Sequence, residues 1–181
     1  MWGGDGSSGV YPIPYIGKLS VEEGSQLTSI GDYAFANDWS DNAARVASID
    51  FTNATNLDYI GVYAFGWNEA LTTAALPGVR EIAYGAMSQN TSLTSLTLGE
   101  GVEEIGEYAF AGSYLLTSLD LPDSVRVIGY QAFSNSGILT DVYIDYDKNG
   151  ENGGLVLLPT YWGHSYSDVS VSVPDGVEEI M

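Results

Sequence analysis

Apolar residues recur along this chain in a six-residue phrase, Ile-Gly-x-Tyr-Ala-Phe. Clear copies begin at Ile30, Ile60 and Ile105, and degenerate copies begin at Ile82 and Ile128. The steps between these isoleucines are 30, 22, 23 and 23 residues. A period in the twenties is typical of a solenoid, in which each turn buries its apolar side chains against neighbouring turns. The pattern therefore predicts a repeat solenoid with turns of about 23 residues.

A second apolar phrase follows each isoleucine phrase, with apolar residues at i, i+3 and i+5. The last two are two residues apart, which is the period of a strand with one buried face. A turn signal such as Pro77-Gly78 follows several copies. We therefore expect one short strand in each turn. The copies are Val46-Ile49-Phe51, Leu71-Ala74-Leu76, Leu93-Leu96-Leu98, Leu116-Leu119-Leu121 and Leu139-Val142-Ile144.

The same spacing sets the expected domain limits. A further strand phrase, Ile16-Leu19-Val21, lies upstream, so we expect a single solenoid over 16–181 after a leader of residues 1–15. Residues 171–180 match the end of a strand and the following turn, and the chain then stops in mid-repeat. That stop favours either further repeats in a longer protein or pairing with another chain. The period fails after Ile144, and an irregular insertion is expected at 145–168.

The two phrases together, Ile-Gly-x-x-Ala-Phe and Leu-x-x-Leu-x-Leu-Pro-Asp-Ser-Val, resemble the BspA-like (treponemal-type) leucine-rich repeats over about residues 16–144 and 171–180. The resemblance implies a right-handed horseshoe or rod, with a short strand on one side of each turn and irregular or helical backbone on the other. Members of that family are mostly secreted or cell-surface proteins associated with adhesion, and they are not enzymes. The resemblance thus implies an extracellular or cell-surface location for this chain.

The family often has a cysteine three residues after the phenylalanine, where this chain has short polar residues. Such side chains bond to nearby backbone in tight turns, so we expect a stacked polar ladder. Its members would be Asp38, Asn68, Asn90, Ser113 and Ser136.

The composition of the chain argues against several classes of partner. The formal charge is -19, from 24 acidic and 5 basic residues, so phosphate backbones and anionic lipid surfaces are repelled. The acidity favours solubility, or attraction of a cation or a basic partner. There is no cysteine and one histidine, and no phosphate-binding loop or nucleophile motif is present. No apolar stretch reaches 18 residues, so no membrane span is expected.

Residues between the buried strand positions must point outward and form two columns. These columns are mostly small and hydroxylated, and they turn acidic and aromatic toward Tyr143. They form either a plain solvated sheet face or a concave binding strip. The candidate partner-binding residues are Asp50, Thr97, Asp120, Asp141 and Tyr143 from the strands, and Trp162 from the insertion.

The tyrosines of the isoleucine phrase, Tyr33, Tyr63 and Tyr108, are expected to align on another face. Their regular recurrence favours packing between neighbouring turns, while tyrosine is also a common binding residue. Trp39, in the long loop of the first repeat, and Trp67 either form an exposed pair that binds a sugar or peptide, or a tryptophan holds its own loop in place.

The segment 145–152 matches the first half of a calcium-binding loop, Asp-x-Asp-x-Asn-Gly, in which alternate oxygens converge on the ion. The usual glutamate at position twelve is replaced by Val156, and the preceding segment is a predicted strand. The alternative is a polar hairpin, for which Asn149-Gly150 is a strong signal. The candidate Ca²⁺ ligands are Asp145, Asp147, Asn149 and Glu151.

Two functions fit these features. The first is a non-catalytic adhesion or binding module for a protein or a cell-surface ligand. The second is a structural subunit that associates end to end into fibres or larger assemblies.

Overall fold

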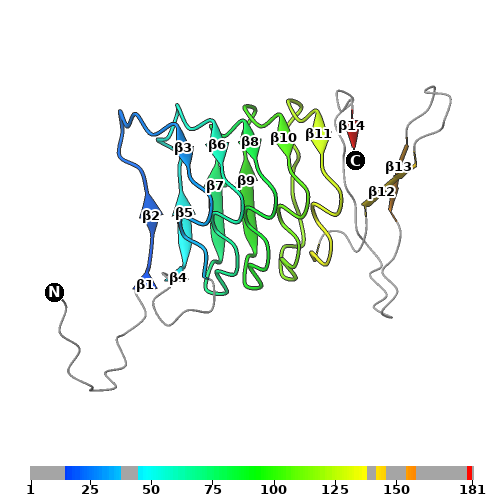
Figure 1. Ribbon diagram of the computed structural model, residues 1–181, viewed down its shortest axis with the longest axis horizontal. Helices are drawn as coiled ribbons and strands as arrows, with labels where there is room; N and C mark the ends of the chain where they lie inside the picture. The colour runs from blue at the N-terminus through cyan, green and yellow to red at the C-terminus, as the bar shows by residue number, and fades with distance from the viewer. Residues whose placement is uncertain (1–14, 38–44, 138–141, 146–153, 158–178, 181) are drawn as a thin grey trace, which may run out of the picture.

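The chain winds into a straight stack of turns. The computed structural model describes residues 15–37, 45–137, 142–145, 154–157 and 179–180. In Figure 1 the chain rises through a strand of one sheet, turns, and descends through a strand of a second sheet before the next turn begins. Neighbouring strands of both sheets pair in parallel, because each pair comes from successive turns.

The isoleucine phrases form a six-stranded sheet. Each strand has two residues, and Ile30, Ile60 and Ile82 pair with one another in register. The same register continues to Ile105 and Ile128. The sheet order is β14–β11–β10–β8–β6–β3. The strands are β3 (Ser29–Ile30), β6 (Tyr59–Ile60), β8 (Glu81–Ile82), β10 (Glu104–Ile105), β11 (Val127–Ile128) and β14 (Glu179–Ile180).

Four of the second apolar phrases form a four-stranded parallel sheet in the order β2–β5–β7–β9. Ile49 pairs with Ala74, which pairs with Leu96, so the buried positions of successive turns lie next to each other. The strands are β2 (Leu19–Ser20), β5 (Ser48–Asp50), β7 (Thr73–Leu76) and β9 (Ser95–Leu98).

Two pairs of strands lie outside these sheets. β1 (Tyr15–Ile16) pairs in parallel with β4 (Arg45–Val46). β12 (Val142–Asp145) pairs with β13 (Gly154–Leu157), and this pairing is antiparallel. Among the described residues, β12 therefore does not extend the four-stranded sheet, although its sequence matches the strand phrase.

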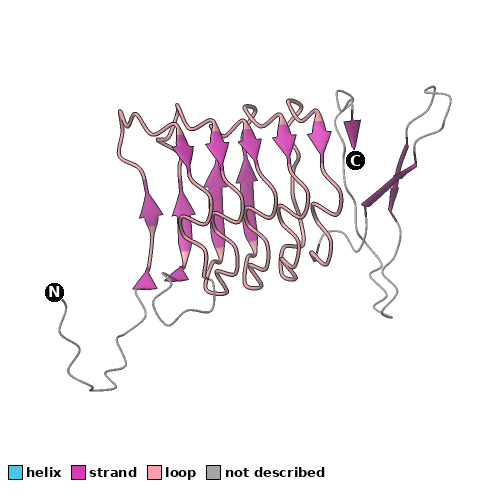
Figure 2. Cartoon of the chain, viewed as in Figure 1, coloured by secondary structure: helices cyan, strands magenta, loops and turns pink. Residues whose placement is uncertain are grey.

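The predicted solenoid is confirmed, and the structure adds a strand to it. The phrases at 16–21, 46–51, 71–76 and 93–98 give the expected strands, but residues 116–121 are described without one, so the prediction of a strand there is wrong. The isoleucine phrases form strands of their own, so a turn with both phrases in strand form holds two. No helix occurs in the described part of the chain, and irregular backbone completes each turn (Figure 2). The limits of the leader and of the insertion stay predictions.

One continuous core lies between the two sheets. Phenylalanines of the isoleucine phrases stack on their counterparts in neighbouring turns at two places, and Met87 takes this core position in the turn between them. The rings of Phe35 and Phe65 are 5.2 Å apart and nearly parallel, and those of Phe110 and Phe133 are 5.4 Å apart. Burying a side chain of this size stabilises the fold by about 1.5–3 kcal/mol. The core therefore couples each turn to its neighbours.

The predicted polar ladder is confirmed at Asn68 and Asn90, which are fully buried. Nδ2 of Asn68 donates to the Phe35 carbonyl at 2.7 Å, in the preceding turn, and to the Phe65 carbonyl at 3.2 Å. Ser113 replaces the asparagine one turn later, and its buried Oγ has no hydrogen-bond partner. Asp38 lies outside the described residues.

Candidate binding faces

Tyrosines from five successive turns form a continuous row on the side of the solenoid that carries the six-stranded sheet. The centroids of neighbouring rings are 5.5 Å apart for Tyr33 and Tyr63 and 5.4 Å apart for Tyr63 and Tyr84. The next two steps are 5.6 Å, from Tyr84 to Tyr108, and 5.8 Å, from Tyr108 to Tyr130. We call Tyr33, Tyr63, Tyr84, Tyr108 and Tyr130 the tyrosine row.

The backbone of the isoleucine phrase explains how the row forms. The residue three positions after the isoleucine has a left-handed conformation, with φ of 56° at Tyr33, 50° at Tyr63 and 56° at Tyr108. In the other two turns the tyrosine comes one residue earlier, and Gly85 or Gln131 takes the left-handed position. The ring still reaches the row.

Gly85 also makes room for the row. A Cβ at this residue would lie 2.4 Å from the ring of Tyr63. The glycine thus both adopts the left-handed backbone and allows Tyr63 to pack closely against the following turn. The sequence pattern revealed Tyr33, Tyr63 and Tyr108 but missed Tyr84 and Tyr130, whose position differs by one residue.

The row packs between turns and still faces solvent. Tyr33, Tyr84 and Tyr130 are exposed to 55%, 40% and 45%, while Tyr63 and Tyr108 are half-buried. Trp67 stacks on Tyr63 with ring centroids 4.8 Å apart, so the tryptophan of this loop widens the aromatic surface. The predicted packing of the phrase tyrosines between neighbouring turns is therefore confirmed, and the outer parts of the rings are exposed to solvent.

The hydroxyl groups of Tyr63 and Tyr108 are protonated at neutral pH. Burial and a hydrogen bond with Tyr84 raise the pKa of Tyr63 to about 12. The pKa of Tyr108 is also raised, chiefly by burial, with smaller contributions from Tyr130, Tyr84 and the charge of Glu107. Tyr63 and Tyr108 thus present neutral rings, and Glu107 places negative charge near Tyr108.

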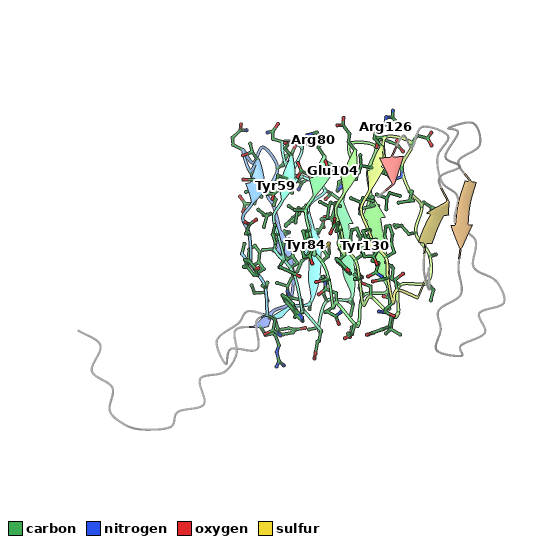
Figure 3. The ribbon with its side chains drawn as sticks, turned by 45° about the vertical axis from the view of Figure 1, so that its right-hand side comes forward. Tyr59, Arg80, Tyr84, Glu104, Arg126 and Tyr130 are labelled. Carbon is green, nitrogen blue, oxygen red and sulfur yellow. The ribbon has the colours of Figure 1, made fainter. Side chains whose placement is uncertain are left out.

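A line of charged residues borders the six-stranded sheet, above the row in Figure 3. Arg80 donates from Nε to Asp58 Oδ1 at 2.8 Å and from Nη2 to Oδ2 at 3.1 Å. The guanidinium lowers the pKa of Asp58, mainly through these hydrogen bonds. Nη2 of Arg80 also lies 3.6 Å from a carboxylate oxygen of Glu81. Arg80 is therefore committed to carboxylates of this chain.

Two of the predicted strand-face residues, Asp50 and Thr97, lie in the four-stranded sheet, whereas Asp120 lies in a stretch described without a strand. Thr97 and Asp120 are exposed and Asp50 is half-buried. Lys18 Nζ lies 2.8 Å from Asp50 Oδ2, and Thr52 donates to Asp50 Oδ1 from both its hydroxyl and its backbone NH. Hydrogen bonds from Lys18, and then from Thr52, lower the pKa of Asp50 to about 2. Asp50 is thus occupied within its own sheet.

Comparison with known proteins assigns the family. Residues 28–149 match the model of the BspA type leucine rich repeat region, in 6 copies. The chain belongs to this BspA-type family. The BspA-type chain is also similar to the crystal structure of a leucine-rich repeat protein from Bacteroides ovatus ATCC 8483, with 26% sequence identity and a TM-score of 0.54. The match covers 65% of this chain and 28% of that one. No curated protein matches.

Family membership gives a coarse function. Repeats of the BspA type are generally non-catalytic and mediate protein–protein interaction. Within the described part of this BspA-type chain, no helix has the length and apolar character needed to cross a bilayer.

The remaining predicted site residues stay untested. Tyr143 and Asp145 lie in β12, for which only the backbone is described. In the described segments, no three or more His, Cys, Asp or Glu side chains are grouped to hold a metal ion. Asp145 pairs with Gly154 across an antiparallel ladder, as the hairpin alternative expects. Asp141, Asp147, Asn149, Glu151 and Trp162 lie outside the described residues.

Proposed function

We propose that this BspA-type domain is a non-catalytic protein-binding module whose contact surface is the tyrosine row. The observation that carries the proposal is the unbroken row of five tyrosine rings, three of them at least 40% exposed. Tyrosine is enriched at binding hot spots because it combines a large apolar area with a hydroxyl group. The solenoid holds the rings in place, so binding costs little side-chain ordering.

The four-stranded sheet is the competing face. Its outward residues are mainly small and hydroxylated, such as Ser95 and Thr97, and they offer less apolar area than the tyrosine row. Asp50 is bonded to Lys18 and Thr52 and would have to give up those bonds to meet a partner. These features favour the tyrosine row, while Thr97 and Asp120 stay candidate contacts to be tested beside it.

We propose in addition that the domain acts in adhesion at the cell surface or outside the cell. Support comes from the family, whose members are mostly secreted or surface proteins. An acidic exterior keeps a rigid domain soluble in such a setting. Protease treatment of intact cells that make the native protein tests this location. Digestion of the repeat domain is expected, and complete protection would contradict it.

Affinity capture tests the binding face. Wild-type domain, the variant Tyr84→Ser/Tyr130→Ser and the matched variant Ser95→Ala/Thr97→Ala would each be incubated with extracts of potential partners. Both variants change two exposed residues, so each should fold. Proteins that bind the wild type and the sheet variant but not the tyrosine variant support the proposal. If partners fail to bind only the sheet variant, the contact surface is the four-stranded sheet and the proposal is wrong.

End-to-end self-association is the alternative function, and it has its own test. Light scattering of the purified domain over a wide concentration range separates the two. A mass that is independent of concentration supports the binding module. Growth into long oligomers would support the structural subunit.

A further inference from the structure

The arrangement of the rings in the tyrosine row narrows the kind of ligand. Successive rings are inclined to each other by 34°, 78°, 58° and 82°. A flat shelf of coplanar rings, which suits the face of a sugar, is therefore absent from this row. At centroid distances of 5.4–5.8 Å the inclined rings are in direct contact, so the row presents an uneven surface of ring faces and ring edges. A side chain that lies on this surface meets the exposed part of a tyrosine ring.

Fixed negative charge lies beside the tyrosine row. Exposed Asp32 precedes Tyr33 directly in the sequence, and exposed Glu107 precedes Tyr108. Glu81 and Glu104 lie in the adjoining strands of the six-stranded sheet, and Figure 3 shows Glu104 above Tyr84 and Tyr130.

The cations on this side are held by the chain itself. Arg80 is bonded to Asp58, and Arg126 donates from Nη1 to the Asp123 carbonyl at 3.0 Å. The row thus combines ring faces with a surplus of carboxylates, as recognition of a cation requires.

We propose that the tyrosine row binds an extended protein segment that carries arginine or lysine side chains, which lie against the exposed parts of the rings. This inference rests on the proposed function and deepens it by naming the partner's chemistry. A cation near the face of a tyrosine gains cation–π energy, and the acidic neighbours supply long-range attraction. The formal charge of -19 would add steering toward any basic partner.

A pair of matched peptides tests this chemistry. The probe is a fluorescent peptide of about eight residues that alternates arginine and serine, a length that spans the row at ~3.3 Å per residue. Its partner has citrulline for arginine, which keeps the shape and removes the charge. Fluorescence anisotropy would measure both affinities. We expect the citrulline peptide to bind at least about tenfold more weakly, since cation–π and ionic attraction are both lost.

Variants of the domain distinguish binding at the tyrosine row from attraction by the overall negative charge. Tyr84→Ser/Tyr130→Ser leaves the net charge unchanged, and we expect it to weaken arginine-peptide binding by about fivefold or more. Glu107→Gln should weaken it by about threefold, while Glu100→Gln, which removes one exposed charge from a turn between the sheets, should change it less. Equal binding by wild type and the tyrosine variant would show attraction by bulk charge only and overturn the inference.

Other outcomes separate the inference from the proposed function. If neither peptide binds but a captured protein still depends on Tyr84 and Tyr130, the tyrosine row is a binding face and the cationic ligand is wrong. Equal affinity for the arginine and citrulline peptides also contradicts the cationic ligand. If a neutral oligosaccharide binds in a tyrosine-dependent way and the arginine peptide does not bind, the ligand of the tyrosine row is a sugar and the cationic ligand is wrong.

Discussion

The backbone NH of Asn68 donates to the side-chain oxygen of Asn90 at 2.9 Å, one turn further along the solenoid. Asn68 repeats this arrangement toward the preceding turn, where its own Oδ1 accepts from the Val46 NH at 2.9 Å. One buried asparagine therefore satisfies backbone groups of two turns at once. The same turns carry the tyrosine row, so this ladder helps to hold the rings at their spacing.

Replacing Asn68 by alanine should destabilise the domain by about 3 kcal/mol, because buried carbonyl and NH groups lose their partners. Urea unfolding followed by circular dichroism measures the change. The control is Asn56→Ala, since Asn56 is exposed and makes one side-chain hydrogen bond to the Ser25 carbonyl at 3.3 Å. An equal, small effect of both substitutions would contradict the role of the ladder.

Replacing Ser113 by asparagine should stabilise the domain by about 1 kcal/mol. Ser113 occupies the ladder position of Asn68 and Asn90, and its buried Oγ has no partner. An asparagine would place an amide oxygen near the backbone NH of Asn90, as Asn90 does for Asn68. The midpoint of urea unfolding should rise. A lower midpoint would show that the serine turn has no room for the longer side chain.

Replacing Gly85 by alanine should cost about 2 kcal/mol or more. The residue has φ of 58°, and an added Cβ would lie 2.4 Å from the Tyr63 ring, so left-handed strain and overpacking combine. Gly31→Ala is the control, because nothing lies within 4 Å of its Cβ position. It should change stability by less than about 0.5 kcal/mol. Equal stability of the two variants would argue against close packing of the row at Gly85.

The Asp50 carboxyl should titrate with a pKa of about 2, below its ordinary value of 3.8. A depressed pKa means that the stabilising contribution of Asp50 is present above about pH 3.8 and is lost as the pH falls toward 2. NMR titration of the carboxyl carbon measures it. Lys18→Met should raise this pKa toward 3.8, while Thr52 keeps part of the shift. An unchanged pKa in that variant would contradict the Lys18–Asp50 pair.

The sequence predicted the features that repeat strictly. The period followed from the isoleucine phrases, and the four-stranded sheet followed from the i+3, i+5 spacing of residues such as Leu93, Leu96 and Leu98. The polar ladder followed from the residue type three positions after the phenylalanine. Each of these features depends on one kind of side chain recurring at one fixed position, and a pattern along the chain records that directly.

The sequence pattern did not predict features that depend on backbone conformation or on strand register. A strand of two residues, such as β8, shows no alternation, so the six-stranded sheet had no periodic signal of its own. Tyr84 and Tyr130 precede the expected position by one residue, and only the left-handed residue after each brings the ring into the row. Lys18 and Asp50 meet because β2 and β5 pair in register.

The central claim is that a protein partner contacts the tyrosine row. Its most direct test is the affinity of a captured partner for wild type, Tyr84→Ser/Tyr130→Ser and Ser95→Ala/Thr97→Ala, measured by calorimetry. We expect the tyrosine variant to bind at least about tenfold more weakly, as loss of hot-spot residues requires. The sheet variant should stay within about twofold of wild type. Unchanged affinity in the tyrosine variant, with loss in the sheet variant, would contradict the claim.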